Sequence, residues 1–397
     1  MIIYTHVFLA ITSLCMELSI ANVAAAGASL PVAHVAQHDA SFENFMSEMG
    51  VHMIGVIGTG SYGYVYKAMY QTRSPDTSIV TTRAVAMKIY KSHALDNDHV
   101  PVDNTTLREI NALRVLSGCK YIARLYDVIM CDNGTMGLLL EYAPVDVMNY
   151  LQLLKNKQGY GFSGDVLMKA ALEFLMAVQY CHRHGIIHRD IKTSNLMMME
   201  DGTLKLIDFG LSKTLLDTTP DYHSMNVITT GYRPPEMFIF ENKWKYSFEV
   251  DVWSVGIVLL EFVFGSAVFA RDMEEIMVLP YMLEILLETP ILYANKFPEQ
   301  YDHGYHFGVP LQSSKLRFDK YISVDRYPVG KYFGNVFVTE PAVVMGVFKG
   351  QRPFIDAYIR LVTSACTFSP SMRPSIDILL QEYAPFLAES IDMYSHL

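Results

Sequence analysis

Three short motifs place residues that could do chemistry in a fixed order along the chain. They read IGTGSYGYVYKA at 57–68, HRDIKTSN at 188–195 and IDFG at 207–210. Because glycine has no Cβ, a glycine-rich hairpin lets the backbone come close to phosphate oxygens. The carboxylate and amide oxygens of the other two motifs suit a hard divalent cation. Taken alone, the glycine pattern is equally compatible with a hairpin that binds no ligand.

Together the motifs resemble the signature set of eukaryotic-type protein kinases. A fourth part of that set, VAMK ending at Lys88, lies between the first two motifs. The resemblance covers roughly residues 50–385. It implies an α+β, two-lobed protein kinase fold, in which a small antiparallel β-sheet lobe with one main helix is joined to a larger, mainly helical lobe. It also implies transfer of the γ-phosphate of ATP to a hydroxyl of a protein substrate, with ATP and Mg²⁺ as cofactors.

The resemblance assigns the nucleotide to the first lobe. Lys88 would bind the α- and β-phosphates while paired with Glu109 on the main helix, although Glu109 could instead form a capping box with Thr106. The hinge would offer backbone groups of Glu141 and Ala143 to adenine. The other implied contacts are Ile57, Gly58, Gly60 and Gly63 of the glycine-rich segment, and Val65, Ala86 and Met197 around adenine, where ordinary core packing is the alternative.

The second and third motifs would carry the transfer itself. By resemblance, Asp190 would accept or orient the proton of the substrate hydroxyl, Asn195 would bind one magnesium ion, and Asp208 would bind the ion that bridges the β- and γ-phosphates. Lys192 is the residue expected of serine/threonine kinases and would steady the γ-phosphate. Thr229 resembles the threonine that hydrogen-bonds the catalytic Asp in those enzymes, so the implied acceptor is serine or threonine.

The family comparison gives other polar residues a structural role. His188 would be a packed core histidine and not a general base, and Asp251 of DVWSVG would anchor the structure beneath it. Glu236 of PPE and Arg373 of SPSMRP resemble a buried ion pair that holds the activation segment to the larger lobe. Such a pair is costly to break because one charge is then left buried alone.

Finer features resemble the cyclin-dependent kinases. The stretch DNTTLREI at 103–110 is similar to their PSTAIRE-type helix, which implies a possible cyclin-like activator. Ser224 stands where these kinases carry their activating threonine. Arg108, Arg189 and Lys213 would receive a phosphate there, although Arg108 and Lys213 could simply be solvated.

Two further positions and one departure bear on regulation and specificity. Ser61 and Tyr62 stand where the cyclin-dependent group takes inhibitory phosphates, and both could equally be unmodified structural residues. Thr230 and Gly231 replace the Leu and Trp that are usual in the group, which weakens an inference of proline-directed specificity. Residues 300–350 match no recognisable pattern.

A competing class is the pseudokinase, a scaffold that binds nucleotide without turnover. Its usual mark is loss of a catalytic residue. Here Lys88, Glu109, Asp190, Asn195 and Asp208 are all present. The sequence therefore favours an active enzyme.

Composition agrees with a globular protein of two domains or lobes. The chain has 397 residues, of which 51% are hydrophobic and 18% charged, so it can bury a large core. A formal net charge of -10 argues against a general nucleic-acid binder, since affinity for phosphate comes from clustered Lys and Arg. The cysteines form no C-x-x-C pair, which predicts reduced thiols and no zinc site. They are Cys15, Cys119, Cys131, Cys181 and Cys366.

The pattern of apolar residues predicts the elements that must position the motifs. Three strands at 52–57, 63–70 and 84–90 indicate an antiparallel sheet. A helix at 104–116 has Leu107, Ile110, Leu113 and Leu116 as its apolar positions. Beyond Pro144 the chain is mainly helical, with helices predicted at 164–184, 248–264, 274–287, 354–366 and 375–383.

The resemblance to protein kinases implies a kinase domain at 51–385, divided into lobes 51–143 and 144–385, with a tail at 386–397. Residues 1–45 form an N-terminal extension whose first 28 residues are partly similar to a secretory signal, but no Lys or Arg precedes the apolar stretch. The alternatives are a targeting element for the secretory route and a disordered or packed extension of a cytoplasmic or nuclear protein. No segment has the unbroken apolar length of an integral membrane helix.

Overall fold

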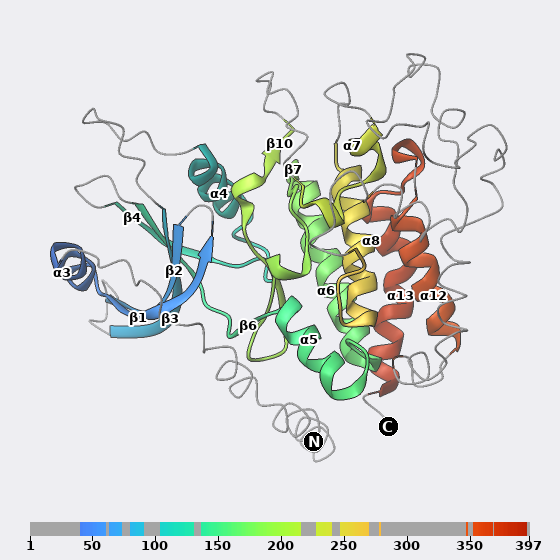
Figure 1. Ribbon diagram of the computed structural model, residues 1–397, viewed down its shortest axis with the longest axis horizontal. Coiled ribbons are helices and arrows are strands. Elements are labelled where there is room, and N and C mark those ends of the chain that lie inside the picture. Colours follow the sequence, from blue (N-terminus) through green and yellow to red (C-terminus); the bar gives the residue numbers. More distant parts are fainter. Residues whose placement is uncertain are drawn as a thin grey trace, which may run out of the picture. The chain divides into compact units, whose positions relative to one another are not determined.

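The structure is a computed structural model. It describes residues 40–60, 63–73, 80–90, 104–130, 136–215, 228–239, 247–269, 352–367 and 369–394, and the single positions 278 and 347. The described residues divide into two compact units (Figure 1). The first unit comprises the chain up to Asp146 together with Met197–Gly210, and the second comprises Val147–Leu196 and the chain from Leu211 onward.

The first unit is built on a five-stranded antiparallel sheet with the strand order β1-β2-β3-β5-β4. Its helix α4 (Asn104–Val115) carries the motif that resembles PSTAIRE. The three predicted strands and the predicted helix are confirmed, and each strand is longer than predicted. The strands are β1 (Val51–Gly60), β2 (Gly63–Arg73), β3 (Val80–Tyr90), β4 (Leu125–Met130) and β5 (Met136–Glu141).

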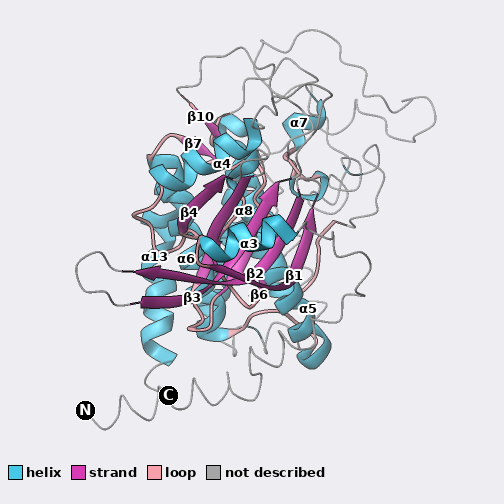
Figure 2. Ribbon diagram, turned by 90° about the vertical axis from the view of Figure 1, so that its left-hand side faces the viewer, coloured by secondary structure: helices cyan, strands magenta, loops and turns pink. Residues whose placement is uncertain are grey.

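Alternation along β3 separates the two faces of this sheet, because successive side chains of a strand point to opposite sides. Met87 packs in a core cluster with Phe42 and Met46 of helix α3 (Ala40–Glu48), which lies against the sheet in Figure 2. Tyr90 packs on the other side with Ile110 of α4. Because α3 is packed, the folded part of the chain begins before the predicted domain start at residue 51.

A second small sheet attaches Met197–Gly210 to the first unit. Its strands β6 (Val145–Asp146), β8 (Leu196–Met198) and β9 (Leu204–Leu206) lie in the order β6-β8-β9. The Leu206 carbonyl accepts the Ala123 amide at 3.0 Å, and the Leu206 amide donates to the Tyr121 carbonyl at 2.9 Å. This segment, predicted as part of the second lobe, therefore brings the IDFG motif into the first unit.

The second unit is a group of helices around α8 (Glu249–Phe264), in which nearly every residue is buried. Helices α6 and α12 pack against it, and α13 packs against α6 and α12 (Figure 1). The predicted helices at 164–184, 248–264, 354–366 and 375–383 are confirmed, whereas 274–287 and 300–350 lie outside the described residues except for single positions. The other helices of this group are α5 (Val147–Gln158), α6 (Gly164–Arg183), α12 (Arg352–Ala365) and α13 (Ile376–Tyr394).

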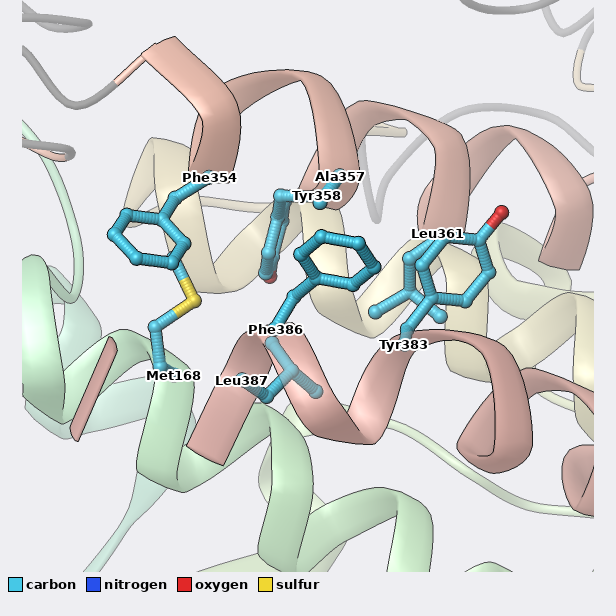
Figure 3. Close-up of a pocket in the computed structure, with 8 residues that line it drawn as sticks. All are labelled: Met168, Phe354, Ala357, Tyr358, Leu361, Tyr383, Phe386 and Leu387. Carbon is cyan, nitrogen blue, oxygen red and sulfur yellow. The ribbon is translucent and has the colours of Figure 1, made fainter. Parts of the chain in front are cut away.

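A small apolar hollow lies where α6, α12 and α13 meet (Figure 3). Met168, Tyr358 and Leu361 line it together with Phe386 and Leu387 of α13. Helix α13 thus continues beyond the predicted boundary at residue 385 and buries Leu387. Among the described residues, no helix is both long and apolar enough to cross a bilayer.

Candidate functional site

The first group of candidate site residues surrounds Lys88 in the first unit. The Lys88 ammonium lies 2.8 Å from Glu109 Oε2 and 2.9 Å from Asp208 Oδ1. Burial alone would lower the pKa of Lys88, but the two carboxylates outweigh it and raise the pKa, so the side chain stays charged. Helix α4 already begins at Asn104, so Glu109 lies too far into the helix for the capping box with Thr106.

Two residues of the motifs have a backbone conformation that is rare without glycine. Among the described residues, Arg189 with φ 65° and Asp208 with φ 64° are the ones other than glycine in the left-handed region. Such conformations cost free energy and persist where the surroundings impose them, often at functional sites. Here Lys88 bonds the side chain of Asp208, and the Arg189 guanidinium donates to the Leu211 carbonyl at 2.6 Å.

The glycine-rich segment forms the hairpin of β1 and β2. Gly63 is required by packing, since a Cβ there would lie 1.9 Å from the Ile89 carbonyl oxygen. Gly58 has no such requirement, because its Cβ would meet only Val65, at an ordinary 3.7 Å. Packing therefore does not explain why residue 58 is glycine. A hairpin that comes close to a ligand would explain it. Gly60 ends β1, Ile57 is 43% exposed, and Ser61 and Tyr62 lie outside the described residues.

The residues predicted around adenine share one face of the sheet with Lys88. Val65 pairs with Lys88 across the strands, and Ala86 precedes Lys88 by two positions. Val65, Ala86 and Met197 are all half-buried. At the predicted hinge, the Glu141 carboxylate bonds Lys205 at 2.7 Å, and its backbone amide donates to the Arg124 carbonyl. Ala143 is buried.

The second group surrounds Asp190 in the second unit. Its Oδ1 accepts the Thr229 hydroxyl at 2.7 Å, and its Oδ2 accepts the Asn195 amide at 2.9 Å and the Lys192 ammonium at 2.7 Å. Lys192 also donates to Thr229 at 3.1 Å. A short 3₁₀ turn, η1 (Thr193–Asn195), brings Asn195 back onto the acid. Three residues singled out in the sequence therefore fix one carboxylate.

A buried network beside Asp190 was not predicted. The Thr193 hydroxyl donates to Glu261 Oε2 at 2.8 Å, and the Tyr232 hydroxyl donates to the same oxygen at 2.7 Å. Glu261 lies on α8 and Tyr232 in the 3₁₀ turn η3 (Thr230–Tyr232). The separation of these residues along the chain hides the network, and the only signal in the sequence is an acidic residue inside the apolar run of α8.

Asp251 holds the backbone in front of Asp190. Its carboxylate accepts the amides of His188 at 2.7 Å and Arg189 at 2.9 Å, as well as His182 Nε2 at 3.0 Å. Burial opposes the charge of Asp251, but these donors, His182 foremost, hold its pKa below the usual range. His188 is fully buried, as predicted for a core histidine, and His182 was missed.

The predicted ion pair between Glu236 and Arg373 is confirmed. The Arg373 guanidinium contacts both carboxylate oxygens of Glu236, at 2.9 and 3.1 Å, and both side chains are fully buried. Arg373 also donates to the carbonyls of Glu249 and Thr367. The pair thereby joins α7 (Pro235–Ile239) to α8 and to the turn before α13.

The residues predicted to receive a phosphate are divided between the units. Arg108 is half-buried on α4 of the first unit, and Arg189 is buried in the second. Lys213 begins β10 (Lys213–Thr214), which pairs with β7 (Ile186–Ile187) two residues before Arg189. Ser224 lies outside the described residues. The described cysteines Cys119, Cys181 and Cys366 are free thiols.

Comparison with known proteins adds an independent observation. Residues 51–384 match the family described as "Protein kinase domain". A chain in the structure of the CAK complex of Chaetomium thermophilum bound to ATP-gamma-S is similar in fold. It has a TM-score of 0.61 and 24% sequence identity, and the match covers 85% of this chain and 92% of that one.

Three curated relatives are similar in sequence. "Cell division control protein 2 homolog 3" of Trypanosoma brucei brucei is 33% identical over 55% of this chain, which spans only 64% of that relative. "Cyclin-dependent kinase 1" of Encephalitozoon cuniculi is 29% identical over 80% of this chain and 90% of that protein. "Cyclin-dependent kinase B2-2" of Arabidopsis thaliana is 34% identical over 59% of this chain and 70% of that protein.

Proposed function

The chain belongs to the protein kinase family, and from this premise we propose that it transfers the γ-phosphate of ATP to serine or threonine hydroxyls of a protein substrate. The observation that carries the proposal is the fixed carboxylate of Asp190, which accepts from Lys192, Asn195 and Thr229. A group that receives a proton during transfer has to be held in one orientation toward the acceptor hydroxyl.

Phosphoryl transfer depends on positioning and on neutralising charge, and the described side chains suit both tasks. Lys88, charged between Glu109 and Asp208, would bind the α- and β-phosphates. Lys192 would face the γ-phosphate. Asp190 would take the proton of the substrate hydroxyl. The hydroxyl oxygen would bond to the γ-phosphorus while the bond between that phosphorus and the leaving oxygen of ADP breaks.

The adenine ring would lie against the sheet face that Val65 and Ala86 share with Lys88, with Met197 on its other side. The hinge backbone at Glu141 and Ala143 would supply hydrogen bonds to the ring edge. The glycine-rich hairpin from Ile57 to Gly63, through Gly58 and Gly60, would cover the phosphates. This placement of the hairpin is supported by Gly58, where the packing of neighbouring atoms does not require glycine.

Magnesium fits the donors that are present. Mg²⁺ is usually held by one or two protein oxygen ligands together with substrate phosphates, so no dedicated cluster of protein ligands is needed. Asp208 supplies a carboxylate and Asn195 an amide oxygen for this role. When bound, the ion would neutralise part of the charge on the phosphate oxygens.

The likeness to cyclin-dependent kinases supports two regulatory proposals. Phosphorylation of Ser224 would place about -1.5 to -2 charges near Arg189 and Lys213, and Arg108 would be a third partner. An activator of the cyclin type would bind the outer side of α4, where Leu107 is 49% exposed and open to an apolar contact. Ser61 and Tyr62 would be sites of inhibitory modification.

The test is transfer from labelled ATP by the purified chain with Mg²⁺ and an array of Ser-Pro, Thr-Pro and non-proline peptides, with and without a cyclin. Asp208→Asn serves as the blank. We expect transfer by the parent chain and none by the variant. ATP binding without transfer in every condition would contradict the proposal and identify a scaffold that binds nucleotide.

A further inference from the structure

Tyr90 lies at the centre of the Lys88 group, although no motif contains it. It follows Lys88 by two positions on β3, so both side chains are on the sheet face that meets α4. Its ring is 9% exposed and packs in a core cluster with Ile110, Met136 and Leu138. The ring is therefore fixed between two strands and the helix.

The Tyr90 hydroxyl donates a hydrogen bond to Glu109 Oε2, the same oxygen that lies 2.8 Å from the Lys88 ammonium. That ammonium is also 5.4 Å from the centre of the Tyr90 ring, within the range of a cation–π contact. Glu109 is only 1% exposed, so its carboxylate depends on these donors in place of water.

Electrostatics keep the hydroxyl in the donating form. Burial of the ring raises the pKa of Tyr90, and the negative charge of Glu109 raises it further, more than Lys88 lowers it. The hydroxyl therefore stays protonated and able to donate. Its hydrogen bond to a buried carboxylate is of the charge-assisted kind, which is stronger than a neutral one.

The contacts join the side chain of Glu109 and its neighbour Ile110 to one tyrosine. Rotating or shifting α4 so that Glu109 left Lys88 would break the hydroxyl bond and uncover the apolar cluster at the same time. We propose that Tyr90 is a positioning residue that holds Glu109 against Lys88, so that α4 keeps this ion pair without a partner protein. This inference rests on the proposed function and deepens it by naming a device that regulates the same site.

The experiment compares the full chain with Tyr90→Phe and with Tyr70→Phe. Tyr90→Phe keeps the ring and the apolar cluster and removes only the hydroxyl. Tyr70→Phe is the matched control, since it removes a tyrosine hydroxyl that donates to Asp127 at 2.9 Å on the exposed part of the same sheet. The measurements are kcat and KM for ATP without a cyclin, and hydrogen exchange of α4.

We expect Tyr90→Phe to lower kcat/KM for ATP about tenfold, which corresponds to about 1.4 kcal/mol, and to speed exchange in residues 104–115. Tyr70→Phe should leave both unchanged. Equal behaviour of the two variants would overturn the proposal. If the parent chain transfers no phosphate, the proposed function fails, while the exchange of α4 still decides whether Tyr90 holds the helix.

A second comparison asks whether the hydroxyl acts through Glu109. Glu109→Met removes the acceptor, so adding Tyr90→Phe to it should leave ATP affinity unchanged. A further loss of affinity, as large as in the parent background, would show that Tyr90 acts by another route and would also overturn the proposal.

Discussion

Thr193 ties the loop that carries Asp190 to the core of the second unit. Its hydroxyl donates to Glu261 at 2.8 Å and lies 3.1 Å from the Tyr232 hydroxyl, and all three side chains are buried. Lys192 comes directly before it in the chain. A shift at Thr193 therefore moves the ammonium that is proposed to meet the γ-phosphate.

Thr193→Val keeps the shape of the side chain and removes the hydroxyl. Loss of a donor to a buried carboxylate should cost about 1–3 kcal/mol of stability. Since the loop is displaced more than the sheet of the first unit, where ATP is proposed to bind, kcat should fall while KM for ATP changes little. Thermal unfolding and steady-state kinetics check this. Thr193→Ser retains the hydroxyl and is the control, so an equal loss in both variants would contradict the role of the hydrogen bond.

Residues with a proposed chemical task were easier to predict than residues that support them. Lys88, Asp190 and Asp208 stand in short motifs, because the phosphate and magnesium chemistry proposed for them allows few residue types at fixed spacing. Tyr90 and Thr193 act on partners 19 and 68 positions away, and any of several residues could fill such positions. Only the folded chain brings them to their partners, so no local pattern indicates them.

At the scale of elements, periodicity predicted where helices and strands lie better than which side each residue faces. In α4, apolar residues recur every three positions, and each step lags a full turn by about 60°. The amide of Leu116, one residue past the end of α4, still donates to the Ala112 carbonyl, so the helical turn includes it. From Leu107 to Leu116 the lag amounts to about 180°, and the two lie on opposite sides. Leu107 is accordingly 49% exposed, whereas Ile110, Leu113 and Leu116 are buried.

Element boundaries depended on contacts that a sequence does not show. Helix α3 was missed because its apolar residues Phe42 and Met46 belong to a core formed mainly by later strands. Helix α13 extends past the predicted end at residue 383 and contains Pro385, and beyond it Leu387 is buried against its neighbours. In both cases, burial against other elements determines where the helix lies.

The ion pair of Arg373 and Glu236 tests how elements of the second unit are joined. Arg373→Met leaves the Glu236 carboxylate buried without its main partner and removes donors to two backbone carbonyls. We expect a loss of roughly 3–5 kcal/mol in the free energy of unfolding, measured by denaturant titration.

The control is an ion pair of the same kind at the surface. Arg183 contacts Asp377 at 2.6 Å, but the two side chains are 62% and 50% exposed. Arg183→Met should therefore cost at most about 1 kcal/mol. Equal losses for the two arginines would mean that burial of the Glu236 pair does not determine its contribution.

At the scale of the whole molecule, the candidate residues are divided between two units. Lys88, Glu109 and Asp208 belong to the first unit, and Asp190 with Lys192 belongs to the second. The IDFG motif reaches the first unit because β9 bonds to the chain around Ala123, a connection that the order of motifs along the sequence does not reveal. If the proposed function is right, this division predicts that ATP binding and phosphate transfer can be impaired separately.

Lys88→Met and Asp190→Asn test this separation. Lys88→Met removes the charge that is proposed to bind phosphate and leaves Glu109 and Asp208 to repel each other. ATP affinity should therefore fall by roughly 10- to 100-fold, as expected for losing a charged hydrogen bond. Asp190→Asn keeps the hydrogen-bonding shape of the side chain but cannot take a proton. It should retain ATP affinity while kcat falls about 10²–10⁴-fold.

Titration of ATP by calorimetry, together with single-turnover transfer, measures the two effects on the same preparations. If Asp190→Asn lost ATP affinity as severely as Lys88→Met, the second unit would contribute to nucleotide binding itself, and the division of tasks between the units would be wrong.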